Sequence, residues 1–336
     1  MTKQQVDVIE KYMETMPNDF GNRTLARKII VDNPGLFDPD ELENIRRAIR
    51  YRRGAVGKDH RRFGREKFVR EEMKPSEYME QYIKKGDKLA KEAWKLPEHN
   101  KKVLLISDLH IPYHDLESIN TALDYGFKEG IDSIYINGDL IDFAKISRWE
   151  KDPNIKTVPV EVDMVREFLE GLSALNVDIY YKLGNHEDRW NSYLLGNAPE
   201  LYNLDRFQIS DVLGLDDLDI PLIDSKQRAL FGHLNVVHGH EFGQSIFSPV
   251  NPARGLFLRA KTSVIAGHNH QTSSHHEGNL NGKQTACFST GCLCDLEPMY
   301  RPFAYTKWNH GGAIVDVEGD NYSVQNFRIM DGRIVG

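Results

Sequence analysis

The sequence predicts an α/β fold that follows a small all-α N-terminal domain. Short apolar runs typical of buried strands alternate with helical patterns at residues 118–128 and 162–175, in the manner of βαβ units. Beyond residue 270 the pattern changes to strands of antiparallel type. These strands are predicted at residues 285–289, 312–317 and 322–329, with a turn at residues 318–321 between the last two. A parallel half followed by an antiparallel half predicts the fold class.

The N-terminal residues contain three helical patterns. The first is predicted at residues 5–16, and the second begins with Thr24 as an N-cap candidate. The third begins with Asp38 as the cap and Glu41 as its partner in a capping-box-like pair. Three short helices with a tight Pro-Gly turn before the last one resemble a helix-turn-helix module.

Three parts of the chain are therefore predicted. Residues 1–72 form a basic, helix-turn-helix-like module. Residues 73–99, rich in Lys and Glu, are predicted to be a connecting helix or linker. Residues 100–336 contain the strand pattern of the α/β domain.

Basic residues are concentrated in one segment of the N-terminal module. Residues 46–70 contain 11 Lys and Arg against 2 acidic residues, although the whole chain has a net charge of −7. A segregated basic patch with interleaved aromatic residues is the electrostatic pattern expected of phosphate-backbone binding, so we expect a nucleic acid, DNA first, as the partner. The alternative is a solvated helix face or a basic linker. The candidate contacts are Arg46, Arg47, Arg50, Arg52, Arg53, Arg61 and Arg62.

Composition indicates a globular protein of the cytoplasm. The chain has 336 residues, 40% hydrophobic and 28% charged, and no run of 18 apolar residues that would cross a membrane. Its polar N-terminus lacks the apolar region of a secretory signal. The three cysteines, Cys287, Cys292 and Cys294, form no disulfide framework and lack the partners of a zinc site, so we expect reduced thiols. The oligomeric state stays open.

Metal-ligand residue types follow five strand-like runs. The runs are predicted at residues 103–106, 134–136, 177–183, 236–237 and 264–265. The segments that follow them contain Asp108 and His110, then Asp139 and Asp142, then Asn185 and His186, then His238 and His240, and finally His268 and His270. In open α/β sheets, ligands bind beyond the carboxyl ends of the strands. One such segment is common by chance, but five in succession predict a single site.

These residue types suit phosphate ester hydrolysis. Two divalent ions about 3.5–4 Å apart neutralise anionic oxygens, generate a nucleophile from water near neutral pH and stabilise the leaving oxygen. Mixed imidazole and oxygen ligands favour manganese, with iron or zinc as alternatives, over calcium. The predicted cofactor is therefore a pair of divalent ions.

The five motifs resemble those of the calcineurin-like metallophosphoesterase superfamily: D-x-H, G-D-x-x-D, G-N-H-[ED], a His near a Gly, and G-H-x-H. The resemblance covers roughly residues 100 to 330. It implies a four-layer α/β/β/α sandwich of two mixed sheets, and a hydroxide bridging the two metals as the nucleophile. It assigns Asp108, His110, Asp139 and His270 to the first metal. To the second it assigns Asp139, Asn185, His238 and His268.

The resemblance also implies catalytic and substrate-binding residues. His186 would be a general acid or would stabilise the leaving oxygen, and Asp142 would orient it or else cap a helix. Arg189 is a candidate contact for the substrate phosphate, with helix packing as the alternative. His240 would line the cleft or belong to a turn. Residues 191–230 form a motif-poor insert that is a candidate cap over the cleft.

The class of phosphate ester is the open question. Phe143 and Ala144 follow Asp142, where protein Ser/Thr phosphatases of the superfamily have Arg-Gly. The basic module favours a phosphodiesterase or nuclease acting on DNA. The alternative is a small-molecule phosphatase or pyrophosphatase acting on nucleotides or diphosphates. A DNA-binding protein without turnover is the third hypothesis, which the complete ligand set disfavours.

Overall fold

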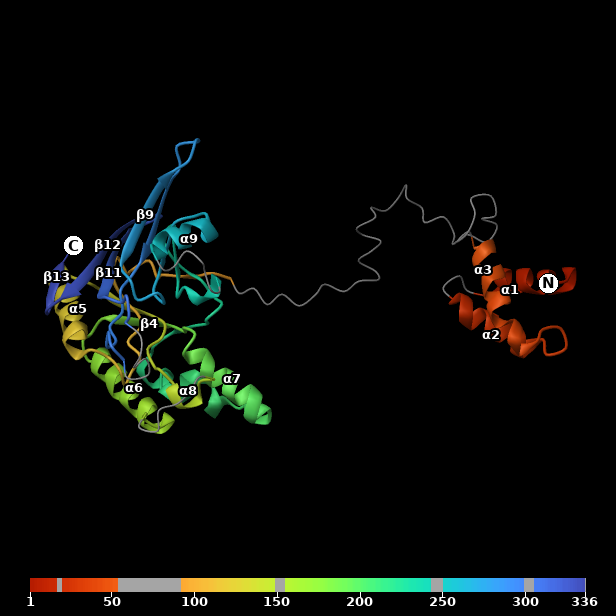
Figure 1. Cartoon of the computed structure of the whole chain (residues 1–336), viewed down its shortest axis with the longest axis horizontal. Helices are drawn as coiled ribbons and strands as arrows, with labels where there is room; N and C mark the ends of the chain where they lie inside the picture. The colour runs from red at the N-terminus through yellow and green to blue at the C-terminus, as the bar shows by residue number, and fades with distance from the viewer. Residues whose placement is uncertain (17–19, 54–91, 149–154, 243–249, 299–304, 336) are drawn as a thin grey trace. The chain divides into compact units, whose positions relative to one another are not determined.

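The computed structural model describes residues 1–16, 20–53, 92–148, 155–242, 250–298 and 305–335. The chain divides into two compact units, Met1–Asp87 and Lys88–Gly336 (Figure 1). The predicted boundary at residue 72 lies outside the described residues and stays a prediction. Among the described helices, none is long and apolar enough to cross a membrane.

The N-terminal unit contains the three predicted helices, α1 (Lys3–Thr15), α2 (Asn22–Asp32) and α3 (Leu42–Arg52). Each helix contributes one apolar face to a shared core. The buried side chains of this core are Ile9, Met13, Leu25, Ala26, Ile29, Phe37, Ile45 and Ile49. The N-terminal residues therefore form a three-helix unit with its own core. The likeness of this unit to a helix-turn-helix module stays a prediction.

The two predicted helix caps have different outcomes. Asp38 accepts from the backbone N–H of Asp40 at 2.9 Å, and Glu41 accepts from the backbone N–H of Asp38 at 3.1 Å. This capping box is confirmed, although it begins a 3₁₀ turn, η1 (Pro39–Glu41), that leads into α3. Thr24 as an N-cap is wrong. The helix begins two residues earlier, because the N–H of Leu25 already bonds the carbonyl of Gly21 at 2.9 Å.

The second unit is built on two mixed β-sheets. The first sheet has the order β13-β12-β11-β2-β3-β4-β5, and the second has the order β1-β6-β7-β8-β10-β9. The strands of the first sheet are β2 (Lys102–Ile106), β3 (Ser133–Asn137), β4 (Asp178–Lys182), β5 (Leu222–Ile223), β11 (His310–Glu318), β12 (Asn321–Met330) and β13 (Arg333–Val335). Those of the second are β1 (Trp94–Lys95), β6 (Ala229–Phe231), β7 (Leu234–Val237), β8 (Val264–Ala266), β9 (Ser273–Gly278) and β10 (Gln284–Ser289).

Four layers result, as predicted. Helices α5 (Leu116–Glu129), α6 (Val158–Ser173) and α8 (Ile209–Leu213) pack on the outer face of the first sheet. Helix α9 (Pro252–Ala260) packs on the outer face of the second sheet. Side chains alternate along each strand. Leu104 of β2 therefore faces the helices, whereas its neighbour Val103 lies in the core between the sheets.

One predicted connection is tested only at its end, and another is corrected. Residues 73–91 of the predicted connecting helix or linker lie outside the described residues, whereas residues 92–99 contain strand β1 in place of a helix, because the N–H of Trp94 bonds the carbonyl of Arg228 at 3.0 Å. The insert at residues 191–230 is not a cap along its whole length. Its later part forms α8, β5 and β6, and Leu213 is fully buried in the core. Its remaining elements are the end of α7 (Glu187–Asn197) and the 3₁₀ turns η3 (Pro199–Leu201), η4 (Asp205–Phe207) and η5 (Asp216–Leu218).

The parallel strands bring the motifs together. In the first sheet β2, β3 and β4 are parallel neighbours, and in the second sheet β7 and β8 are. Their carboxyl ends therefore lie at the same edge of each sheet. This arrangement confirms the predicted placement of the motifs.

Candidate metal centre

The seven predicted metal ligands lie directly after five strands. Asp108 and His110 follow β2, Asp139 follows β3, Asn185 follows β4, His238 follows β7, and His268 and His270 follow β8. Oδ1 of Asp108 lies 3.0 Å from Nε2 of His270, and Oδ2 of Asp139 lies 3.3 Å from Nε2 of His238. Each of these pairs joins one sheet to the other, so both sheets contribute to one site.

Five of these residues have backbone torsions that L-residues seldom adopt. The φ angles are 57° for Asp108, 50° for His110, 53° for Asp139, 63° for His268 and 55° for His270. A left-handed conformation costs a residue with a Cβ on the order of 1–3 kcal/mol, and such residues cluster at functional sites. The sharp turns after the strands therefore direct the side chains toward one another at a cost in stability.

Glycines in the motifs permit the loops to pack closely. A Cβ at Gly184 would lie 2.2 Å from Oδ1 of Asp139. A Cβ at Gly267 would lie 2.4 Å from Oγ of Ser107 and 2.5 Å from Oδ2 of Asp108. Only glycine fits at these two positions, because no real Cβ approaches so closely.

The predicted first set of ligands forms one cluster. Nε2 of His110 lies 3.3 Å from Nε2 of His270 and 3.8 Å from Oδ2 of Asp139. Oδ1 of Asp108 lies 4.0 Å from the same His110 atom. All four side chains are buried. Two imidazole nitrogens and two carboxylates thus face one point, as a cation requires.

The predicted second set shares Asp139 with the first. Ligand atoms of Asp139, His238 and His268 all lie within 4.8 Å of one another. The ring centroids of His238 and His268 are 5.2 Å apart. His268 is exposed, whereas His238 is fully buried, so this side of the site opens to solvent.

Three buried atoms of the site have no hydrogen bond of ordinary geometry, although two of them, Oδ2 of Asp139 and Nε2 of His238, pair with each other at 3.3 Å. They are Oδ2 of Asp139, Oδ1 of Asn185 and Nε2 of His238. Buried polar atoms are nearly always hydrogen-bonded, and leaving one unbonded costs about 1–3 kcal/mol. All three belong to the predicted second set of ligands. The residues present therefore fit a bound cation.

The charges of the site are strongly coupled. Burial alone would raise the pKa of Asp139, but the neighbouring His186 and His238 hold it well below its usual range. Burial alone would lower the pKa of His238, but Asp139 and Asp108 raise it to about 10. Protons on His238 and His270, whose pKa values are both raised to about 10, balance the carboxylates in the metal-free protein, and a metal has to displace them because it binds neutral His.

Asp142 contacts two histidines. Its Oδ1 lies 2.9 Å from Nδ1 of His110 and 2.9 Å from Nδ1 of His186. Both rings present Nε2 toward the metal-ligand cluster, since Nε2 of His186 is 3.8 Å from Oδ2 of Asp139. Asp142 caps no helix, because Phe143 occupies the N-cap position of the following turn η2 (Ala144–Ile146) and makes no side-chain cap bond.

Arg189 contacts both His186 and Asp142. Its Nη2 lies 2.8 Å from Nε2 of His186, and its Nη1 donates to the carbonyl of Asp142 at 2.6 Å.

The next residue, Trp190, packs against the loop after Asp142. Its ring stacks on Phe143, with 5.8 Å between the centroids, and its Nε1 donates to the carbonyl of Phe207 at 2.8 Å.

His240 lies beside the second set of ligands. It begins the 3₁₀ turn η6 (His240–Phe242), and its ring centroid is 5.3 Å from that of His238 and 6.2 Å from that of His268. Its Nε2 lies 3.6 Å from Oδ2 of Asp188. The residue is thus part of a turn and also adjacent to the site.

Two acidic groups support the loops, the buried Glu187 and the half-buried Glu241, and sequence reasoning missed both. Glu187 accepts from the backbone N–H of Leu140 at 2.8 Å and of Gly184 at 2.7 Å, and from the hydroxyl of Tyr181 at 2.7 Å. Glu187 ends the third motif, and its position there was the available signal. It connects the loop after β3 to the loop after β4.

The second missed group is an ion pair. Nζ of Lys182, whose side chain is fully buried, lies 3.1 Å from Oε1 of Glu241. Glu241 in turn accepts from the backbone N–H of His238 at 3.0 Å and of Gly239 at 2.6 Å. Lys182 and His238 lower the pKa of this carboxyl to about 2, against the effect of burial. A lysine inside the strand-like run 177–183 was the only signal in the sequence.

Of the arginines predicted to contact nucleic acid, those that the structure describes are either bonded within the N-terminal unit or exposed on α3. Arg46 pairs with Glu43 at 2.9 Å, Arg52 pairs with Glu10 at 3.2 Å, and Arg53 donates to the carbonyl of Phe20 at 2.6 Å. Arg47 and Arg50 are exposed one turn apart on α3. Arg61 and Arg62 lie outside the described residues.

The fold and the site define a class of protein. Residues 101–295 match the family model for calcineurin-like phosphoesterases. The chain belongs to this family and is a metal-dependent phosphoester hydrolase.

Individual relatives are more distant. The chain is 27% identical over 245 residues to the gene 54 protein of Mycobacterium phage L5, and 26% identical to that of phage D29. Each match covers 70% of this chain and 96% of the phage protein.

Solved structures also resemble the chain. Vacuolar protein sorting 29 from Cryptosporidium parvum matches with a TM-score of 0.38 and 16% identity, over 70% of this chain and 95% of that one. The E. coli phosphoesterase Yfce matches with a TM-score of 0.33 and 15% identity, over 70% of this chain and 97% of that one. A dimetal phosphatase from Danio rerio matches with a TM-score of 0.34 and 14% identity, over 68% of this chain and 96% of that one. These low scores add no argument about substrate.

Proposed function

We propose that the site holds two divalent ions and hydrolyses phosphodiesters. Asp108, His110, Asp139 and His270 would hold the first ion. Asp139, Asn185, His238 and His268 would hold the second. The observation that carries this proposal is the buried Oδ1 of Asn185, which has no hydrogen-bond partner, together with the close pair of Asp139 Oδ2 and His238 Nε2 at 3.3 Å; a cation would bind all three atoms. Manganese is the proposed metal, because borderline imidazole and oxygen ligands suit it.

The bound ions would neutralise phosphate oxygens and lower the pKa of bound water, so that a nucleophile forms near neutral pH. The protein supplies orientation. Asp139 lies in both ligand clusters and is the proposed bridge. Asn185 is a neutral ligand, so it adds no negative charge to repel the phosphate. The exposed His268 marks the side from which substrate enters.

His186, Asp142 and Arg189 would act on the leaving group. Asp142 fixes the ring of His186 through Nδ1, so that Nε2 points toward the cluster. Arg189 lies against this same Nε2 at 2.8 Å. The guanidinium can only donate, so Nε2 is the acceptor in this arrangement. When the guanidinium binds a phosphate oxygen instead, Nε2 would take up a proton from water and donate it to the leaving oxygen. His240, beside His268, would line the cleft.

DNA is the proposed substrate. Arg47 and Arg50 support this proposal because they are exposed on one helix of the unit that precedes the hydrolase domain. Small-molecule phosphate esters are the second candidate. Arg46, Arg52 and Arg53 favour it, because their partners lie within the N-terminal unit and fewer arginines remain for a phosphate backbone. The cytoplasm is the proposed compartment, since all three cysteines are free and buried.

A cleavage assay separates these candidates. The manganese-loaded full chain is incubated with labelled single- and double-stranded DNA, and with bis-p-nitrophenyl phosphate. The variant Asp139→Asn is the control. Metal-dependent cleavage of DNA that this variant lacks supports a nuclease. Hydrolysis of the aryl ester with intact DNA would contradict the DNA proposal and favour a small substrate.

A second experiment tests the N-terminal unit. Arg47→Ala/Arg50→Ala should weaken DNA binding and reduce its salt dependence, because about one counterion is released for each phosphate contact. Arg23→Ala/Arg27→Ala is the matched control, since it removes the same charge from exposed positions of α2. Equal losses for both variants would contradict a specific contact by α3. Aryl ester hydrolysis should be unchanged in both.

A further inference from the structure

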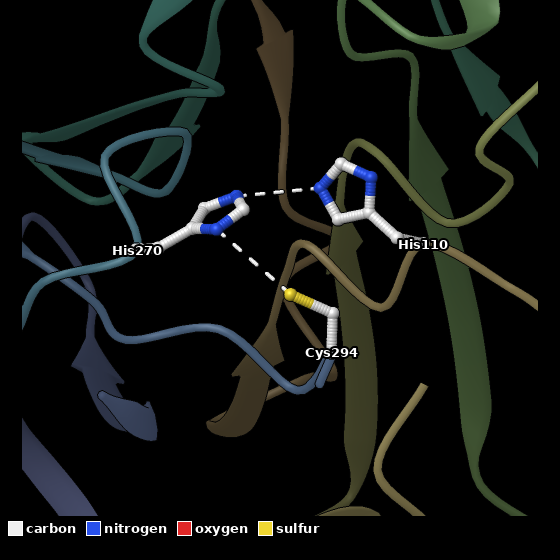
Figure 2. A group of neighbouring side chains, drawn as sticks. All are labelled: His110, His270 and Cys294. Carbon is white, nitrogen blue, oxygen red and sulfur yellow. Dashed lines mark hydrogen bonds between the residues drawn. The ribbon is translucent and has the colours of Figure 1, made fainter. Parts of the chain in front are cut away.

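Each of three proposed ligand histidines presents its second ring nitrogen to a different acceptor. Nδ1 of His110 lies 2.9 Å from Oδ1 of Asp142. Nδ1 of His238 lies 2.7 Å from the carbonyl oxygen of Asn137. Nδ1 of His270 lies 3.8 Å from Sγ of Cys294, as Figure 2 shows. The first two are oxygen acceptors, and the third is sulfur.

The tautomer of His270 determines what the sulfur does. Nε2 of His270 faces Asp108 at 3.0 Å and His110 at 3.3 Å, so Nε2 is the atom aimed into the cluster. A neutral imidazole that binds a metal through Nε2 carries its proton on Nδ1. Nδ1 is therefore the donor, and Sγ of Cys294 is the acceptor.

We propose that Cys294 is the positioning residue of His270, holding its ring and tautomer for metal binding. This inference rests on the proposed two-metal function. Metal-binding histidines depend on such partners, and losing one costs about 10–100-fold in metal affinity. Sulfur is a weak acceptor, so His270 is held less firmly than His110 or His238.

The surrounding contacts fix Cys294 in place. Its side chain is fully buried, and its carbonyl accepts from Nε2 of His310 at 2.9 Å. The preceding residue, Leu293, donates its N–H to the carbonyl of Asp108 at 3.2 Å. The thiol is thus tied to the loop that contains another proposed ligand. On the other side, the ring of Trp308 packs against His270 with 4.2 Å between centroids.

The other two cysteines provide controls. Cys292 is also buried, with its sulfur 3.7 Å from the carbonyl of Asn309, and it interacts with His270 both electrostatically and through a side-chain hydrogen bond, so Cys292→Ala is the competing variant. Cys287 is buried in the core under α9, with its sulfur 3.4 Å from the carbonyl of Thr262. Cys287→Ala removes a buried thiol of the same domain without touching a proposed ligand.

The test measures metal binding directly. Manganese is titrated into the full-length protein and its variants by calorimetry, and free manganese is followed by electron paramagnetic resonance. Cys294→Ala should weaken one of the two binding steps by about 10–100-fold and leave the other unchanged. Cys294→Ser should recover only part of the loss. Its hydroxyl oxygen can accept a hydrogen bond from Nδ1 of His270, but the C–O bond is shorter than the C–S bond of cysteine. Cys287→Ala should bind as the wild type does.

The outcomes separate this inference from the proposed function. Two binding steps in the wild type, unchanged in Cys294→Ala, would overturn the role of Cys294 and leave the metal centre standing. A larger loss in Cys292→Ala than in Cys294→Ala would overturn it as well. A wild type that binds no manganese would overturn both proposals. Thermal melting of the metal-free proteins identifies variants that fail to fold, and Cys294→Ser, closest in size to the native side chain, then decides.

Discussion

The backbone N–H of Asp139 donates a hydrogen bond to Oε2 of the buried Glu187 carboxylate at 3.1 Å. Asp139 returns the connection, because its Oδ1 accepts from the backbone N–H of His186 at 2.9 Å. Each of the loops after β3 and β4 thus donates a backbone hydrogen bond to a carboxylate of the other loop. The conformation of the proposed bridging ligand depends on a residue that binds no metal.

Glu187→Gln should destabilise the protein by about 3 kcal/mol, because hydrogen bonds to a charged group contribute about 1.5–3 kcal/mol and the new amide would face backbone donors. Urea denaturation of the metal-free protein measures this. The exposed Glu170→Gln on α6 is the control and should change the unfolding free energy little. An equally small effect of Glu187→Gln would show that the loops hold without this carboxylate.

Lys182→Met should destabilise the protein by up to about 3 kcal/mol, since it leaves the charge of the half-buried Glu241 without its lysine partner. Lys182→Met/Glu241→Gln should regain part of that loss, because no unpaired charge remains. Denaturation of both variants in urea gives the comparison. A double variant less stable than the single one would show that Glu241 acts mainly through the backbone of His238 and Gly239.

Glu161 should make stability depend on pH. Burial and the nearby Asp142 raise the pKa of this carboxyl from its ordinary value of 4.5 to about 8, against the N–H of Phe143 and the charge of Arg189. The folded protein therefore holds this proton more tightly than the unfolded chain does. The stability contribution is complete below pH 4.5 and is lost as the pH rises through about 8.

Glu161→Gln should remove that slope, which is at most about 1.4 kcal/mol per pH unit. The unfolding free energies of wild type and variant are compared at several pH values between 5 and 9, with Glu170→Gln as the control on the same helix. Parallel curves for wild type and Glu161→Gln would contradict the raised pKa. A difference that changes steadily with pH supports it.

His186→Ala should reduce the rate of hydrolysis most for substrates with poor leaving groups. A general acid contributes about 10²–10⁴-fold to rate when the leaving oxygen needs a proton. The loss of kcat/KM should therefore be large for an unactivated dinucleotide and much smaller for bis-p-nitrophenyl phosphate. An equal loss for both substrates would assign His186 to charge stabilisation or to binding instead of proton transfer.

The strands that precede the motifs, and the position of the motifs after them, could be predicted, because buried strands are short apolar runs and each motif ends one. The resemblance implied that Asp142 orients His186, but the contact of Asp142 with His110 could not be predicted. It depends on loops after β2 and β3 that come together only in three dimensions. Cys294 was missed for the same reason. Its neighbour His270 is 24 residues earlier in the chain. Thr24 was misassigned because a good cap residue also fits the first turn of a helix.

Counting bound manganese tests the central claim most directly. Equilibrium dialysis of the full chain, followed by metal analysis, should give two ions per chain for the wild type. It should give fewer than two for Asp139→Asn, since Asp139 lies in both ligand clusters. Two ions in the wild type with a deficit in the variant are the predicted result. One ion or none in the wild type, or an unchanged pair in Asp139→Asn, would contradict a two-metal centre bridged by Asp139.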